Sequence, residues 1–139
     1  MAAAETIRLV DYYYIETRDK PGEAARILSE LKDARINLLV FSGFPKGRRS
    51  QLDFVPANPA RFKAVAKKAR WKVRGPKKGF FIRGSDRVGA LADLLQKLAD
   101  AGINLTATDA VCAGAGRFGM ILWVKPRDVK RAARAFGIA

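Results

Sequence analysis

Two short acidic turns carry the residues of this chain that are best suited to bind a small molecule. Residues 19–22 read Asp-Lys-Pro-Gly and residues 86–89 read Asp-Arg-Val-Gly, and an apolar pattern of helical spacing follows each turn. A helix N-terminus offers free N–H groups and partial positive charge to a carboxylate. Glycine lets a ligand approach the backbone closely, and the aspartate can pair with an ammonium group. These groups together suit a molecule that carries both charges, such as an amino acid.

An asparagine follows each of these segments, in Ile36-Asn37-Leu38 and in Ile103-Asn104-Leu105. Its amide both donates and accepts hydrogen bonds, which suits a ligand with two charges. A structural interpretation stays open, because an aspartate before a helix is an ordinary N-cap worth about 1 kcal/mol. An asparagine between a helix and a strand is likewise an ordinary connector that tolerates positive φ. The candidate ligand-binding residues are Asp19, Gly22, Asn37, Asp86, Gly89, Asn104 and Thr106.

The chain has no histidine and a single cysteine, Cys112. Without histidine there is no Ser–His or Cys–His nucleophile pair and no histidine general base or metal ligand. One cysteine permits no internal disulfide and gives little basis for a zinc site. We therefore expect no catalysis, no metal and no cofactor, and we expect Cys112 to be a buried or half-buried strand residue.

An internal duplication organises the sequence. Residues 19–38 and 86–105 match at ten of twenty positions under a shift of 67 residues, and the same shift places Pro59 on Pro126. Duplicated segments of this length predict two copies of one fold. We expect a first repeat over residues 1–74, a joint at 75–77 and a second repeat over 78–139.

Each repeat has the pattern of strand, helix, strand, strand, helix and strand. In the first repeat the aromatic residues 12–17 predict a strand, and apolar residues at helical spacing predict a helix after it. Further strands are expected at 36–42, 51–55 and 71–73, with a second helix beginning near Pro59. The predicted class is α+β, with two ferredoxin-like βαββαβ repeats whose antiparallel sheets each carry two helices on one face.

The second repeat is too short for a final strand, since only three residues follow its last helix. Residues 6–10 alternate in polarity and precede the first expected strand. Either they complete the second sheet, so that the repeats interlock, or they extend the first strand over residues 6–16. Both alternatives remain open at this point.

With its acidic turn, glycine, helix and Ile-Asn-apolar strand start, the sequence resembles the ACT-domain family, and it does so twice at constant spacing. Two positions depart from the pattern, because Val88 stands in place of the proline and Arg35 in place of the glycine before Ile36. The resemblance covers nearly the whole chain and implies a stand-alone tandem ACT protein. It implies a regulatory module that binds an amino acid, forms a homodimer and acts on a regulated partner protein.

A strong positive charge favours a second hypothesis, nucleic-acid binding. Lysine and arginine number 27 against 13 acidic residues, and residues 61–83 hold ten basic residues without one acid. Such a surface attracts polyanions. RNA-binding RRM domains share the βαββαβ order, and residues 78–82 and 117–120 partly match their aromatic RNP1 pattern. For this alternative the candidate residues are Arg48, Arg49, Lys67, Lys68, Lys77 and Lys78.

The sequence also predicts a location. No stretch of 18 apolar residues is present, and the first residues lack the basic and apolar regions of a secretory signal. A single cysteine fits a reducing compartment. We expect a cytoplasmic protein without membrane contact.

Overall fold

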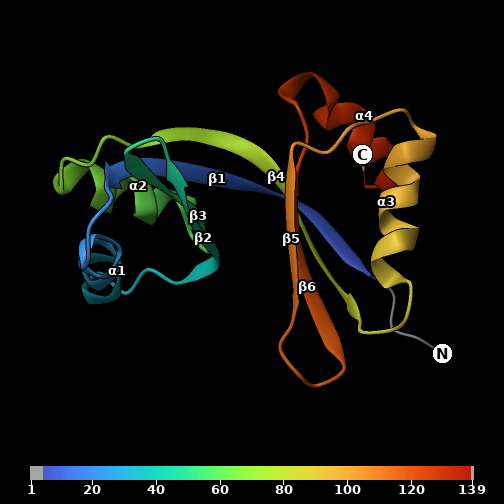
Figure 1. The fold of residues 1–139 in the computed structure, drawn as a ribbon, viewed down its shortest axis with the longest axis horizontal. Helices are drawn as coiled ribbons and strands as arrows, with labels where there is room; N and C mark the ends of the chain where they lie inside the picture. The colour runs from blue at the N-terminus through green and yellow to red at the C-terminus, as the bar shows by residue number, and fades with distance from the viewer. Residues whose placement is uncertain (1–4, 139) are drawn as a thin grey trace. The chain divides into compact units, whose positions relative to one another are not determined.

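The computed structural model describes residues 5–138 and confirms the α+β class (Figure 1). The six strands follow the spatial order β2-β3-β1-β4-β6-β5. Among the described residues, no helix is long and apolar enough to cross a membrane. In chain order the elements are β1 (Thr6–Arg18), α1 (Glu23–Asp33), β2 (Leu38–Lys46), β3 (Arg49–Pro56), α2 (Pro59–Lys68), β4 (Arg74–Ser85), α3 (Ala90–Asp100), β5 (Ala107–Cys112), β6 (Arg117–Trp123) and α4 (Val129–Phe136).

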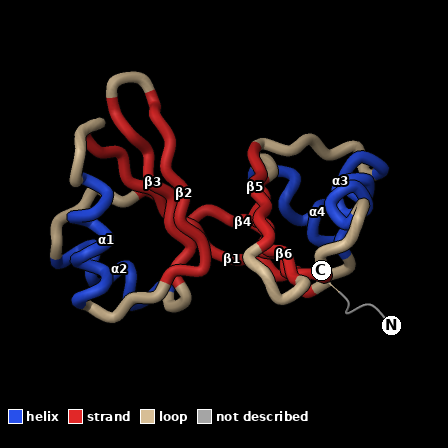
Figure 2. Tube along the Cα trace, turned by 60° about the horizontal axis from the view of Figure 1, so that its bottom comes forward, coloured by secondary structure: helices blue, strands red, loops and turns tan. Residues whose placement is uncertain are grey.

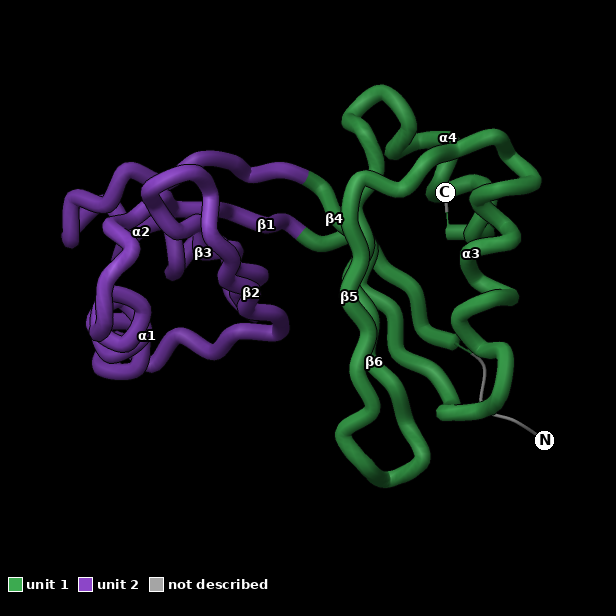
Figure 3. Tube along the Cα trace, viewed as in Figure 1, with its two compact units in different colours: residues 1–10, 78–139 green, residues 11–77 purple. Residues whose placement is uncertain are grey.

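The chain forms two compact units (Figure 3). One comprises residues 11–77, and the other comprises the described residues of 1–10 and 78–139. In each unit both helices lie on the same side of the strands: α1 and α2 in the unit of residues 11–77, and α3 and α4 in the other (Figure 2). Each unit therefore has one apolar core, between its helices and its sheet.

Strands β1 and β4 each contribute to both units. Residues 6–10 of β1 group with residues 78–139, and Ile7 packs against the core of that unit. One strand thus spans residues 6–18, in agreement with the alternative of one long first strand, and its first part groups with residues 78–139. The units also divide differently from the expected domains, since residues 75–77 lie inside β4 rather than in a joint.

Some sequence-based expectations for single residues are wrong. Residues 71–73 do not form a strand. They form a coil segment, and their apolar pattern reflects Trp71 and Val73, which pack against the core. Apolar residues at helical spacing in the second repeat predict a buried helix face that includes Leu91, but Leu91 is 38% exposed, because α3 buries Ala90, Leu94 and Leu98 instead. Cys112 is exposed rather than buried, because every residue of the outermost strand β5 is exposed.

The helices end in one repeated way. Just past the end of each helix, one residue adopts left-handed backbone: Arg35 (φ 57°), Arg70 (φ 60°), Gly102 (φ 70°) and Gly137 (φ 76°). The next N–H then reaches back to a carbonyl in the last turn, as from Ile36 to Leu31 and from Ile103 to Leu98, both at 2.9 Å. This is the Schellman motif, which prefers glycine at the left-handed position. The second repeat has glycine there, whereas the first has arginine at both ends.

Substitutions at two of these left-handed positions, Arg35 and Gly102, should change the free energy of unfolding in opposite directions. We expect Arg35→Gly to stabilise the protein by about 1 kcal/mol, because a non-glycine residue is strained in left-handed backbone. For a chain of this size this corresponds to a melting temperature about 4 °C higher. The reverse change at the matched position, Gly102→Arg, should lower the melting temperature by a similar amount. Thermal unfolding followed by circular dichroism tests both, and a destabilised Arg35→Gly variant would contradict this account.

Candidate functional site

A groove at the start of α3 brings together two of the predicted ligand-binding residues, Asp86 and Gly89. We call it the α3 groove. Its volume is about 300 Å³, and all its lining residues belong to the unit that contains residues 78–139. The turn before α3, the first turn of that helix and the outermost strand β5 form its walls. Its lining residues are Asp86, Arg87, Gly89, Ala90, Leu91, Ala92, Ala110, Val111, Cys112 and Phe118.

The first turn of α3 is open to an incoming acceptor. Gly89 is the N-cap residue in left-handed backbone, and no side chain makes a capping hydrogen bond there. Asp86 is therefore not the N-cap that the structural interpretation allowed. The one acid in the first turn, Asp93, is paired with Arg87 at 2.7 Å. Helix N–H groups without a side-chain cap are available to a carboxylate.

Asp86 faces β5 across the groove. Its carboxylate accepts a hydrogen bond from the Cys112 thiol, and this contact raises the pKa of Cys112 above its usual value. Apolar side chains flank the pair, with Val111 67% exposed and Leu91 38% exposed. The groove thus combines a carboxylate, an uncapped helix start and an apolar wall.

The other candidates of the second repeat lie elsewhere. Asn104 lines a separate basic recess of about 430 Å³, with Lys125, Arg127 and Arg131 among its walls. Thr106 lies just before β5, where its N–H donates to the Trp123 carbonyl at 2.8 Å. Neither residue is among those that line the α3 groove, so the structure divides the predicted set.

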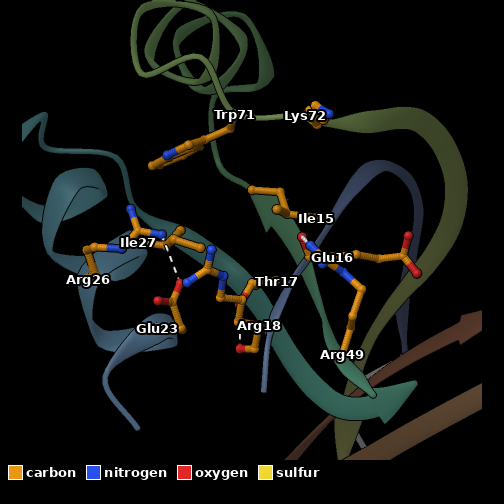
Figure 4. A pocket seen from close by; sticks show the side chains of 10 residues that line it. All are labelled: Ile15, Glu16, Thr17, Arg18, Glu23, Arg26, Ile27, Arg49, Trp71 and Lys72. Atoms are coloured by element: carbon orange, nitrogen blue, oxygen red, sulfur yellow. Dashed lines mark hydrogen bonds and ion pairs between the residues drawn. The ribbon is translucent and has the colours of Figure 1, made fainter. Parts of the chain in front are cut away.

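In the first repeat none of the three candidates is among the residues that line a cavity near the start of α1. Asp19 accepts a hydrogen bond from the Ser50 hydroxyl at 3.1 Å, Gly22 is the N-cap of α1, and the side chain of Asn37 is exposed. This cavity, which we call the Trp71 cavity, has a volume of about 420 Å³ (Figure 4). Its lining residues are Ile15, Glu16, Thr17, Arg18, Glu23, Arg26, Ile27, Arg49, Trp71 and Lys72.

Reasoning from sequence missed most of the Trp71 cavity. Arg49 was a candidate only for nucleic-acid binding, and Trp71 was expected in a strand. Arg18 and Glu23 immediately flank the motif of residues 19–22, so proximity to that motif was the one available signal. Trp71 and Arg49 come from distant segments, and nothing local in the sequence joins them.

The nucleic-acid alternative gains no support from the structure. Of the three aromatic residues in the two partial RNP1 matches, Phe80 and Phe118 are 0% and 4% exposed in the core of the unit of residues 78–139. The third, Phe81, is half-buried, and its ring centroid lies 5.7 Å from the Arg8 guanidinium carbon. Rings buried under the helices cannot stack on bases. The basic candidates come from three different parts of the chain, Arg48 and Arg49 at the β2–β3 turn, Lys67 and Lys68 at the end of α2, and Lys77 and Lys78 on β4.

Comparison with known proteins identifies the fold. No family model and no curated protein matches the chain. A solved structure from Bacteroides thetaiotaomicron is similar, with a TM-score of 0.78 and 16% identity over 92% of this chain and 88% of that one. The regulatory subunit of aspartate kinase from Thermus thermophilus matches with a TM-score of 0.64 and 18% identity over 98% and 97% of the chains. A structure of aspartokinase alpha and beta subunits matches with a TM-score of 0.65 and 17% identity, over 98% of this chain and 96% of that one. The chain therefore shares its fold with these solved structures.

The contact between Asp86 and Cys112 can be tested through the thiol. We expect Asp86→Asn to lower the pKa of Cys112, because the variant loses the carboxylate that holds the thiol proton in a hydrogen bond and repels the thiolate. Cys112 is the only cysteine, so alkylation of the whole protein by iodoacetamide reports on this site alone. The pH at which alkylation accelerates should fall in Asp86→Asn. It should stay unchanged in Asp33→Asn, on α1 of the other unit, and an equal shift in both variants would argue against the contact.

Proposed function

We propose that this protein is a regulatory module that binds an amino acid in the α3 groove and is not itself a catalyst. The observation that carries the proposal is the position of Asp86 beside the uncapped start of α3. The fold shared with regulatory subunits of aspartate kinase supports a regulatory role.

The groove offers a place for each part of an amino acid. The carboxylate of the amino acid would accept hydrogen bonds from backbone N–H groups in the first turn of α3, where partial positive charge favours an anion. The ammonium would pair with the Asp86 carboxylate. The side chain would then lie against Leu91 and Val111, which favours an uncharged, apolar amino acid.

We further infer that the two units are ACT-like repeats that complete each other's sheets. Within each unit the order of elements is strand, helix, strand, strand and helix, and the fourth strand comes from the part of β1 or β4 that the other repeat does not use. This assignment accounts for the missing last strand of the second repeat. It also explains why β1 and β4 are the two longest strands, with 13 and 12 residues.

The outer strand β5 supports a homodimer. All six of its residues are exposed, and Val111 presents apolar surface at the rim of the α3 groove. A second copy paired at this edge would satisfy its free backbone groups and shield the groove from water. The neighbours named as regulatory subunits likewise support a regulated partner protein.

A thermal-shift screen against the twenty amino acids tests the proposal. A ligand present at about 100 times its dissociation constant adds roughly 2.7 kcal/mol of stability, or a shift on the order of 5 °C or more for a chain of this size. We expect one or a few apolar amino acids to give this shift. The same ligands should slow alkylation of Cys112, which lines the groove.

Three aspartate variants locate the site. Asp86→Asn should remove the shift, whereas Asp33→Asn, an equal change of charge away from the groove, should retain it. Asp19→Asn alters the matching position of the first repeat and should retain it as well. A flat response of the unmodified protein to all twenty amino acids, or a full shift in Asp86→Asn, would overturn the proposal.

A further inference from the structure

We propose that the Trp71 cavity is a second binding site, which takes a small organic anion carrying a flat ring. All ten lining residues belong to the unit of residues 11–77, so this site is separate from the α3 groove. The proposal goes beyond the amino-acid site and does not depend on it.

Positive charge in the cavity is only partly compensated. Of the two acidic residues, Glu23 is paired with Arg26 at 3.0 Å, and the Glu16 carboxylate is paired with Lys46 at 3.3 Å. These pairs leave three cations that line the cavity: Arg18, Arg49 and Lys72.

None of these three cations forms an ion pair with a carboxylate among the described residues, although Arg18 is near enough to Glu23 to add to the lowering of the pKa of that carboxyl, which the hydrogen bond from Arg26 mainly causes. The Arg49 guanidinium donates to the backbone carbonyl of Glu16 at 3.2 Å, which does not neutralise its charge. Guanidinium and ammonium groups are the usual ligands of a phosphate or carboxylate.

An apolar surface lies opposite these charges. Ile15 and Ile27, 5% and 1% exposed, belong to the core of the unit and form the floor of the cavity. The Trp71 ring lies at one end, and Arg18 and Arg49 lie toward the other (Figure 4).

The position of Trp71 is fixed by its backbone. Its N–H closes the Schellman turn of α2 on the Ala66 carbonyl at 3.0 Å, and its side chain packs against the core. A tryptophan held in this way is a preorganised platform for a planar group.

The same contacts argue against an amino acid in this cavity. Both carboxylates that could receive an ammonium already have a cationic partner, so the positive end of a zwitterion would have to compete with those cations. A volume of about 420 Å³ falls within the usual range of small-ligand sites. An anion that places its ring on Trp71 and its charge at Arg18 and Arg49 fits the two ends of the cavity, and Lys72 adds positive charge at the Trp71 end (Figure 4).

Calorimetric titration tests the ligand class with four probes. AMP joins a flat ring to a phosphate, and indole-3-acetate joins one to a carboxylate; adenosine lacks the charge and inorganic phosphate lacks the ring. We expect at least one ring-bearing anion to bind about tenfold more tightly than adenosine and inorganic phosphate. Binding should weaken as salt rises, because charge contributes to it. Preference for AMP or for indole-3-acetate distinguishes a phosphate from a carboxylate ligand.

Variants place the binding in the cavity. Arg18→Gln and Lys72→Gln should each weaken it about tenfold, since a hydrogen-bonded charge is lost, whereas Arg134→Gln, the same change of charge on α4, should leave it unaltered. Trp71→Leu should reduce the advantage of AMP over inorganic phosphate. Absence of binding by both ring-bearing anions, or equal binding by Arg18→Gln and Arg134→Gln, would overturn the proposal.

A cross-test separates the two sites. Asp86→Asn should bind the anion normally, and Arg18→Gln should keep the thermal shift produced by amino acids. Either proposal can therefore fail while the other stands.

Discussion

The double use of strands β1 and β4 is the constraint on which the rest of the structure depends. Each strand begins in one unit and ends in the other, so Ile7 packs in one core while Tyr13 and Ile15 of the same strand pack in the other. A side-chain period of two residues fixes which face each position presents along the whole length of a strand. A single break between residues 77 and 78 would leave the unit of residues 11–77 whole, but it would separate residues 6–10 from the unit that they help to build.

On this shared framework, duplication preserved the backbone and the side chains diverged. Helices α1 and α3 both begin at a left-handed glycine and both end in a Schellman turn, at positions related by the repeat. The charges beside them are reversed, because Arg26 of α1 corresponds to Asp93 of α3. One copy contains the cavity lined by Trp71 and Arg49, and the other contains the groove lined by Asp86 and Val111, so the surfaces beside matching helix starts differ in their side chains.

Much of the positive charge has a local structural role. Arg61 donates to the Ala34 carbonyl at 2.7 Å, and Arg131 donates to the Ala101 carbonyl, so each unit has an arginine that satisfies the C-terminal end of its first helix. These two arginines occupy positions that the repeat does not relate, and Lys46 and Lys77 both lie over the Tyr14 ring. Cations at helix C-termini and on aromatic faces are stabilising. The charge excess by itself therefore did not identify a nucleic-acid surface.

The sequence by itself determined the α+β class, the duplication, the helices and the two acidic turns, because hydrophobic period and turn residues are local signals. It also placed Asp86 and Gly89 together, since they share one turn. Only the tertiary structure decided that Cys112 faces Asp86, that Asn104 lies in a different recess, and that Trp71 lines the same cavity as Arg18 and Arg49. These side chains come from segments far apart in the chain, and their meeting depends on strand pairing and helix packing that no local pattern specifies.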